Sequence, residues 1–214
     1  QYSLRSHLQL FVIMFSNILG GAAGFPVADL GDTVSQSLRF RGNRNGATGG
    51  YLERTIATAG DGANLTLSAW LKQGETPESL FVMSCQPGGN GSQFTGPKVN
   101  SNGTLYQYPQ PGGGSSSTNV FRDPSAWYHF VWTVDDGQWN YYINGELVFQ
   151  PTTSDNRVFN AGRRLEVASM DNGASRYGQY LAQVYCIDGQ ALDPTDFGKY
   201  NEDGVWVPQD YTGT

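Results

Sequence analysis

Nucleophilic catalysis of the serine or cysteine type needs a histidine beside the nucleophile, and this 214-residue sequence has only two histidines. His7 lies in an apolar N-terminal segment, and His129 lies in the middle of a stretch whose alternating pattern predicts a strand. A histidine at such a position is more often packed in the core than catalytic. The pattern therefore argues against a catalytic triad and against a zinc site of the His and Cys type.

The two cysteines, Cys85 and Cys186, stand far apart and match no metal-ligand spacing. A chain of this length can build a core without disulfides, so we expect two free, buried thiols. A disulfide is the alternative if their strands are neighbours.

Glycoside hydrolysis needs two carboxyl groups at a fixed separation across a cleft. On a β-sandwich, one strand with acidic residues two apart would supply them, but the sequence has no Glu-x-Asp-x-x-Glu run. Glu166 stands alone in its predicted strand, and the pair 202–203 follows the predicted late helix. We therefore predict that the protein is not an enzyme.

Metals that prefer oxygen ligands are harder to exclude. Asp135, Asp136, Asp171 and Asn172 lie at predicted strand ends, where Ca²⁺ could collect carboxylates and backbone carbonyls. Aspartate and asparagine also favour turns by their own hydrogen bonding, and this simpler interpretation is preferred. No cofactor is predicted, and calcium is the alternative.

Exposed aromatic side chains could bind sugars by stacking, with polar groups fixing the hydroxyls. Tyr106 and Tyr108 flank a Gly/Ser/Pro segment over 109–119 that is predicted to be an exposed loop, and Trp139 and Tyr142 lie on a predicted hairpin. These four residues are the predicted contacts with a glycan or a partner.

The elements that must position these side chains alternate with period two. In 126-AWYHFVWTVDDGQWNYYINGELVF-149, Phe130 and Trp132 share one face with Tyr128 and Val134, while His129 falls on the other. Asp136-Gly137 predicts a tight reversal, and Asn144-Gly145 predicts a type I′ turn. Because both faces are apolar, these strands are expected at the centre of the fold, with most of their aromatic side chains in the core.

The rest of the chain continues this pattern. Further strands are predicted at 37–41, 65–73, 80–85, 104–108, 164–170 and 179–188, with a phase shift at Trp70 that suggests a bulge. Asp193 is predicted to cap a short helix that has Pro194 at its first position and Asp196 near its positive end. The prediction is an all-β, two-sheet antiparallel jelly-roll sandwich over residues 35–214, with one short late helix.

Composition limits the partners. The formal net charge is −6 and the pI is near 4.8, whereas a nucleic-acid-binding protein needs a basic face to replace counterions. No nucleic-acid partner is therefore expected.

Residues 1–34 form an apolar N-terminal arm outside the sandwich. The run 8-LQLFVIMFSNIL-19 could form a helix, but polar residues interrupt it, and a membrane span needs about 20 apolar residues. A signal peptide is an alternative, and Met14 is an alternative start of the natural product. We favour an arm that docks on a partner through seven apolar side chains: Leu10, Phe11, Ile13, Phe15, Ile18, Leu19 and Phe25.

Six segments together carry a resemblance to a known family: 37-SLRF-40, 51-YLERTIATAGDGANLTLSAWLKQG-74, 120-VFRDPSAWYHFVWTVD-135, 141-YYINGE-146, 180-YLAQVYCIDGQALDPTDFG-198 and 204-GVWVPQDYTGT-214. Over roughly residues 35–214 the sequence resembles virion proteins of marine and cyanobacterial tailed phages, which carry a concanavalin-A-like (laminin-G-like, pentraxin-like) jelly roll. No catalytic residues carry over from that family.

The resemblance implies a structural protein on the exterior of the virion. It would be a head decoration or small appendage, docked through its arm onto capsid or tail proteins and forming a symmetric homo-oligomer. The alternative is a tail-fibre module that binds carbohydrates on the host surface, and a polysaccharide hydrolase is less expected.

Overall fold

The computed structural model describes residues 10–13, 34, 36–42, 49–74, 79–87, 96–108, 114–151, 162–170, 175–176 and 178–213. Its largest element is a seven-stranded antiparallel sheet. The strand order is β1 (Leu10–Ile13), β16 (Gln179–Asp188), β4 (Leu65–Gln73), β10 (Tyr128–Asp135), β11 (Gln138–Ile143) and β12 (Glu146–Phe149), and β2 (Leu38–Phe40) also pairs with β16.

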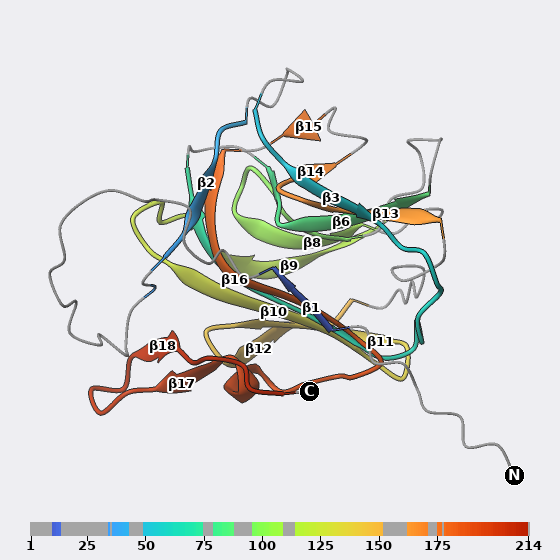
Figure 1. Cartoon of the computed structure of the whole chain (residues 1–214). Coiled ribbons are helices and arrows are strands. Elements are labelled where there is room, and N and C mark those ends of the chain that lie inside the picture. The colour runs from blue at the N-terminus through green and yellow to red at the C-terminus, as the bar shows by residue number, and fades with distance from the viewer. Residues whose placement is uncertain are drawn as a thin grey trace, which may run out of the picture.

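A second layer packs on one face of this sheet (Figure 1). It consists of a three-stranded sheet, β3 (Leu52–Thr55), β13 (Arg163–Val167) and β6 (Met83–Pro87), and a four-stranded sheet, β5 (Leu80–Phe81), β7 (Gly96–Val99), β8 (Thr104–Tyr108) and β9 (Ser115–Val120). Only Val82 separates β5 from β6. A Cβ on Gly96 would lie 2.5 Å from the carbonyl oxygen of Met83, so glycine lets β7 approach β6 and join the two small sheets into one layer.

The main hydrophobic core lies between these two layers. Phe130 and Trp132 of β10 are each 1% exposed, and Tyr141 of β11 is fully buried beside them. Strand β10 pairs with β4 on one side and β11 on the other, which is the central position expected from its two apolar faces. The predicted all-β, two-sheet antiparallel jelly-roll sandwich is confirmed.

The two predicted turns are also confirmed. Asp136 and Gly137 have φ of 46° and 84°, and Asn144 and Gly145 have φ of 50° and 86°. Two successive positive values are what a type I′ turn requires, and they set the register of the β10–β11 and β11–β12 hairpins.

A C-terminal segment forms a third, partial layer on the other face of the seven-stranded sheet (Figure 1). It contains η1 (Pro194–Asp196), β17 (Gly198–Tyr200) and β18 (Trp206–Pro208), while a small hairpin of β14 (Ser169–Met170) and β15 (Ser175–Arg176) lies in the opposite layer. The predicted late helix is a single 3-10 turn. Its predicted cap is present, because the Asp193 side chain accepts from the N–H of Thr195 and the Asp196 carboxylate accepts from the N–H of Asp193.

Two local predictions were wrong. Strand β4 has no bulge at Trp70, because it pairs with β10 in unbroken register and Trp70 belongs to the outer face of the sheet; the irregularity lies in the neighbouring β16, between Ala182 and Tyr185. The loop expected over 109–119 forms strand β9 from Ser115 onward. Among the described strands it pairs with β8 alone, at the edge of its sheet, and its backbone hydrogen bonds to β8 hold it although most of its side chains are polar.

The predicted docking arm is described only in part. Leu10, Phe11 and Ile13 lie in β1, which pairs with residues 184–187 of β16, so the helix considered for this segment was wrong at these positions. Strand β2 continues along the same edge of β16, opposite residues 179–181. The other arm residues, Phe15, Ile18, Leu19 and Phe25, lie outside the described residues. No helix in the described part of the chain is long and apolar enough to cross a membrane.

Cys85 and Cys186 are buried thiols that are not joined in a disulfide, as predicted. Both belong to the main core, Cys85 from β6 and Cys186 from β16. Burial raises the pKa of the Cys186 thiol well above its usual value, and the nearby Cys85 adds to the shift. Both side chains therefore act as small apolar groups that fill the core.

Candidate functional site

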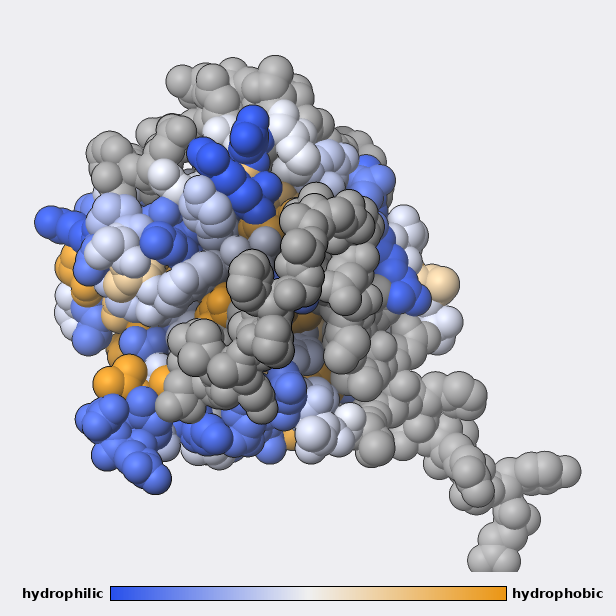
Figure 2. Space-filling model, turned by 60° about the vertical axis from the view of Figure 1, so that its left-hand side comes forward, coloured by the Kyte–Doolittle hydropathy of each residue, from blue (hydrophilic) through white to orange (hydrophobic). Residues whose placement is uncertain are grey.

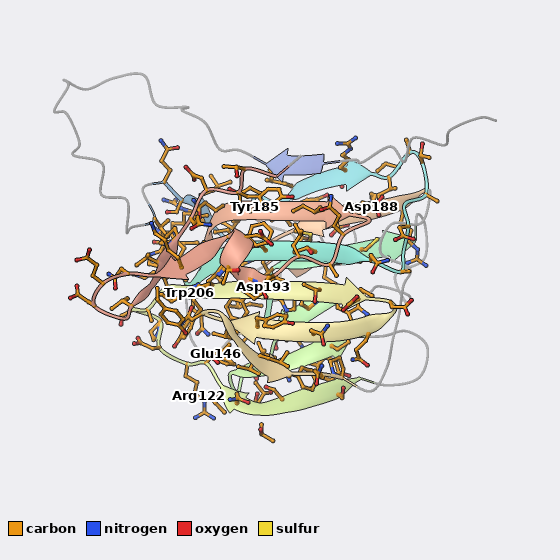
Figure 3. The ribbon with its side chains drawn as sticks, turned by 90° about the horizontal axis from the view of Figure 1, so that it is seen from below. Arg122, Glu146, Tyr185, Asp188, Asp193 and Trp206 are labelled. Carbon is orange, nitrogen blue, oxygen red and sulfur yellow. The ribbon has the colours of Figure 1, made fainter. Side chains whose placement is uncertain are left out.

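The C-terminal segment packs on the outer face of the seven-stranded sheet. The candidate site lies on this face. Figure 3 looks onto this face, with Trp206 toward one end, Asp188 at the other and Asp193 between them. The hydroxyl of Thr66 fixes the incoming chain, because it donates to the carbonyl of Gln190 and accepts from the N–H of Leu192, both at 2.8 Å. The sheet therefore positions everything that follows residue 190.

A second anchor lies under the β17–β18 hairpin. His129 is fully buried there, and its ring stacks on Trp70 at 4.9 Å and on Trp206 at 6.0 Å between ring centroids. Burial lowers the pKa of His129 to about 3, so the ring is neutral. This is the packed histidine expected from its mid-strand position.

An open pocket of about 360 Å³ is formed by the C-terminal segment. Eight residues line it: Gln190, Leu192, Asp196, Gln209, Asp210, Tyr211, Thr212 and Gly213. Apart from Leu192 and Gly213, each lining residue has a polar side chain. A pocket of this size can hold a small ligand, and its polar side chains could form hydrogen bonds with a hydrophilic one such as a sugar ring.

Tyr211 is the aromatic residue of the pocket. Its ring is half-buried, stacks on Phe197 with 4.9 Å between centroids, and meets the edge of Tyr185 at 5.8 Å. Burial, followed by the charge of Asp196, raises the pKa of its hydroxyl. A Cβ on Gly213 would lie 2.1 Å from that hydroxyl oxygen, so the chain folds back tightly around it. The ring is thus held in place before any ligand binds.

The two carboxylates of the pocket are held by hydrogen bonds within the protein. Asp196 accepts from the N–H of Asp193 through Oδ2, and Asp210 accepts through Oδ1 from the side-chain amide of Gln183 at 3.2 Å. Gln183 lies in the irregularity of β16 with φ of 44°, a value that a non-glycine residue rarely adopts. The irregularity takes Gln183 out of the ladder and directs its side chain to Asp210.

A second polar surface lies beside η1, around Tyr142 of β11. Tyr142 is half-buried and packs against the cluster that contains Phe197 and Tyr185, while burial and then the charge of Asp193 raise the pKa of its hydroxyl. Next to it, Gln150 donates to Asn140 at 2.7 Å, and Asn140 donates to Thr133 at 3.3 Å. These amides are satisfied within the protein, so this surface has fewer free groups than the pocket.

The four predicted contact aromatics do not form one site. Tyr106 is half-buried on the outer side of the second layer, 5.7 Å from the Lys98 ammonium, whereas Tyr142 lies across the sandwich on the seven-stranded sheet. Tyr108 is the last residue of β8, opposite Gly96, and its side chain lies outside the described part. The expectation that Trp139 is exposed was wrong: it is 0% exposed, because it shares the core-facing phase of Tyr141.

Two of the four calcium candidates lie at a turn that the structure describes. Asp135 and Asp136 are exposed at the β10–β11 turn, and the N–H of Asp136 donates to the side-chain carbonyl of Asn64 at 3.2 Å. Asp171 and Asn172 lie outside the described residues. Within the described ranges, no three His, Cys, Asp or Glu side chains are placed to hold a metal together.

Asp188, the last residue of β16, has a structural role. Its carboxylate accepts from the N–H of Asp61 at 3.0 Å, and a Cβ on Gly60 would lie 2.0 Å from one of its oxygens. Burial raises the pKa of Asp188, and the charge of Asp61 adds to the shift while the backbone hydrogen bonds oppose it. The side chain thus holds the 60–61 loop against β16.

The sequence matches a family model over residues 45–194, described as the concanavalin A-like lectin/glucanases superfamily. The chain belongs to this superfamily. The match ends at residue 194, so much of the pocket lies beyond it, in the segment 195–213.

A curated relative extends this finding. The chain is 29% identical over 158 residues to adhesion G-protein coupled receptor V1 of Danio rerio, a region that is 68% of this chain and 2% of the receptor. The chain therefore spans only a small part of that relative, and the receptor's activity as a whole does not transfer to it.

Two solved structures show the same fold at low identity. The carbohydrate-binding module CBM40 of the Ruminococcus gnavus IT-sialidase, bound to α2,3-sialyllactose, superposes with a TM-score of 0.51 and 12% identity over 68% of this chain and 95% of that one. A heptameric pentraxin of Limulus polyphemus superposes with a TM-score of 0.50 and 18% identity, over 69% and 73%. The lectin-like sandwich of this superfamily is thus the fold of the chain.

The pocket was not predicted from the sequence. Its C-terminal wall lies in 204-GVWVPQDYTGT-214, a segment that carried the family resemblance but received no function. Asp196 was interpreted only as a helix-terminal charge. The available signal was Tyr211 next to Asp210 in a segment rich in turn residues. Only the fold brings these two residues beside residues 190–196.

Proposed function

We propose that this chain is a non-enzymatic glycan-binding module and that a sugar binds in the pocket beside Tyr211. The observation that carries the proposal is the pocket itself: a fixed, half-buried tyrosine ring next to two aspartates and two glutamine side chains. Aromatic rings and planar polar groups are what sugar recognition uses. The superfamily supports the proposal, and so does the carbohydrate-binding module that shares the fold.

The binding experiment compares the wild-type chain with a pocket variant on a glycan array, followed by calorimetry on the sugars that bind. Tyr211→Ala removes the ring and should weaken binding at least about 10-fold, which corresponds to about 1.4 kcal/mol. The matched control is Tyr200→Ala, because Tyr200 is 52% exposed on the same C-terminal segment and does not line the pocket. Absence of binding at millimolar sugar, or equal loss in both variants, contradicts the proposal.

Binding without hydrolysis is the second element of the proposal. Glu166, the carboxylate of strand β13, is 0% exposed and lies 3.9 Å from Nε of Arg164, which places it out of reach of a substrate. We expect no release of reducing sugar from any glycan that the array identifies. Steady release that is lost in Asp196→Asn or Asp210→Asn would show a hydrolase instead.

We further propose that the module acts on the exterior of a phage particle, as a head decoration or small appendage and as a symmetric homo-oligomer. The sequence resemblance supports this placement, with a tail-fibre module that binds host glycans as the alternative. The predicted docking arm would attach the module to capsid or tail proteins. Ordering an arm costs about 1–2 kcal/mol per residue, and burying each large apolar side chain returns about 1.5–3 kcal/mol, so docking can be favourable.

Deletion of residues 1–30 tests this placement. The deletion removes β1 but leaves β2, which still covers part of the same edge of β16, so we expect a folded sandwich. The truncated chain should bind sugar normally and fail to join virions. Normal incorporation of the truncated chain would contradict the docking role, and labelled particles would show whether the module lies on the head or the tail.

A further inference from the structure

The charge of the pocket indicates which sugars it accepts, an inference that rests on the proposed glycan-binding function. Asp196 and Asp210 line the pocket, and Asp193 precedes them at the cap of η1. None of the eight lining residues is Lys, Arg or His. The formal charge of the whole chain, −6, has the same sign.

Each lining carboxylate has one oxygen committed inside the protein. Asp196 uses Oδ2 for the N–H of Asp193, and Asp210 uses Oδ1 for the amide of Gln183. Among the described residues, the other oxygen of each has no hydrogen bond. Both remain as charged acceptors beside the Tyr211 ring, and such acceptors form their strongest hydrogen bonds with hydroxyl or ammonium donors.

Gln183, which holds the Asp210 carboxylate, adopts an unfavourable conformation. This cost argues that the position of the carboxylate serves a function. Gln183 adopts a positive φ in the irregularity of β16, and its Oε1 is buried without a hydrogen-bond partner in the described part of the structure. Strained backbone and an unsatisfied buried polar atom both oppose folding, and such features concentrate at functional sites. Here they coincide at the one side chain that holds the Asp210 carboxylate.

We propose that the Tyr211 pocket selects neutral, hydroxyl-rich sugars and discriminates against anionic ones such as sialic or uronic acids. Hydroxyl groups donate to the uncommitted oxygens of Asp196 and Asp210, whereas a sugar carboxylate meets two like charges with no cation among the lining residues. The carbohydrate-binding module that shares this fold is bound to an anionic sugar, α2,3-sialyllactose, so fold alone does not determine this choice.

Matched sugar pairs test the proposal. Calorimetry would compare lactose with α2,3-sialyllactose, and galactose with galacturonic acid, which differ only in the group at C6. The anionic member of each pair should bind at least about 10-fold more weakly at low salt, and the difference should narrow at high salt because the repulsion is screened. Equal or tighter binding of the anionic sugar overturns the selectivity and leaves the glycan-binding function intact, while no binding of any sugar overturns both.

Charge-neutral variants connect the selectivity to the pocket. Asp210→Asn and Asp196→Asn keep an acceptor oxygen for Gln183 and for the cap of η1, so the fold should be retained. Both should weaken binding of the neutral sugar and narrow the neutral-to-anionic ratio by at least about threefold. Asp203→Asn, on the exposed β17–β18 tip, is the control and should leave the ratio unchanged. An unchanged ratio in both pocket variants overturns the proposal.

Discussion

Trp206 donates its indole N–H to Nδ1 of His129 at 3.0 Å, across 77 residues of sequence. Because indole is only a donor, Nδ1 must accept, and the ring proton lies on Nε2, which is 2.9 Å from the hydroxyl of Ser68. The three side chains come from β18, β10 and β4. They form a buried polar chain that ties the C-terminal segment, and with it the pocket, to the centre of the large sheet.

The first prediction concerns the loss of this hydrogen-bond donor. Trp206→Phe keeps most of the ring but leaves Nδ1 of the buried His129 without its partner, which should lower the free energy of unfolding by about 1–3 kcal/mol. Urea unfolding followed by far-ultraviolet circular dichroism measures the change. Tyr200→Phe is the matched control on the same hairpin, because its hydroxyl bonds Glu146 at an exposed site and should change stability by less than about 0.5 kcal/mol.

The second prediction concerns pH. His129 has a pKa of about 3 in the folded protein, against 6.5 for an unperturbed histidine. Between those values the unfolded chain binds a proton that the folded chain excludes, so stability decreases as the pH falls through this window. The free energy of unfolding is unaffected by this histidine above about pH 6.5. Below that pH it declines by up to about 1.4 kcal/mol per pH unit. Urea midpoints of the wild type should therefore fall more steeply than those of His129→Gln.

A spectroscopic measurement checks the same prediction without altering the site. His7→Gln leaves His129 as the single histidine of the chain. Its ring-proton chemical shift in NMR spectra should stay constant from about pH 8 to about pH 5, because a neutral, buried ring does not titrate there. A midpoint near the usual value of about 6.5 would contradict the assignment of a desolvated ring.

The sequence predicted the strands well where alternation was strong. Phe130, Trp132 and the two Asp/Asn-Gly turns are determined by local pattern, because a strand between two apolar layers needs both faces filled. Strand β9 could not be predicted, since Ser115–Val120 has no apolar phase and exists by pairing with β8. The local sequence pattern does not predict an edge strand of this kind.

The candidate site was largely beyond prediction from sequence. Trp139 was expected outside because it follows a turn, yet it lies in the core because it shares the phase of Tyr141. Tyr211 and Asp210 became functional candidates only when the C-terminal segment was seen to fold back over β16. Such juxtapositions depend on long-range packing that no local period encodes.

The third prediction separates core aromatics from surface aromatics. Trp132→Ala and Trp139→Ala should each lower the free energy of unfolding by about 3–5 kcal/mol, through lost burial and the cavity left behind. Tyr142→Ala should cost about 1 kcal/mol or less, because its ring is only half-buried. Thermal melts and expression levels measure the split. Equal costs at Trp139 and Tyr142 would mean that the two faces of β11 are assigned wrongly.

The last prediction uses two glycines at equivalent turn positions. Gly137 and Gly145 have nearly the same φ, 84° and 86°. The backbone conformation alone should therefore make alanine lower the free energy of unfolding by the same amount at both positions, about 1 kcal/mol. Their surroundings differ: a Cβ at 137 meets nothing within 4 Å, whereas a Cβ at 145 would lie 2.6 Å from the ring of Trp206. Gly145→Ala should therefore displace that ring and cost clearly more than Gly137→Ala.

The displacement has a consequence at the pocket. If Trp206 ties down the C-terminal segment, Gly145→Ala should shift tryptophan fluorescence to longer wavelength and weaken sugar binding, although position 145 does not line the pocket. Gly137→Ala should leave both unchanged. If the two variants lose equal stability and bind sugar equally well, the ring of Trp206 does not hold the segment, and the hydrogen bond to His129 would be a local contact without influence on the site.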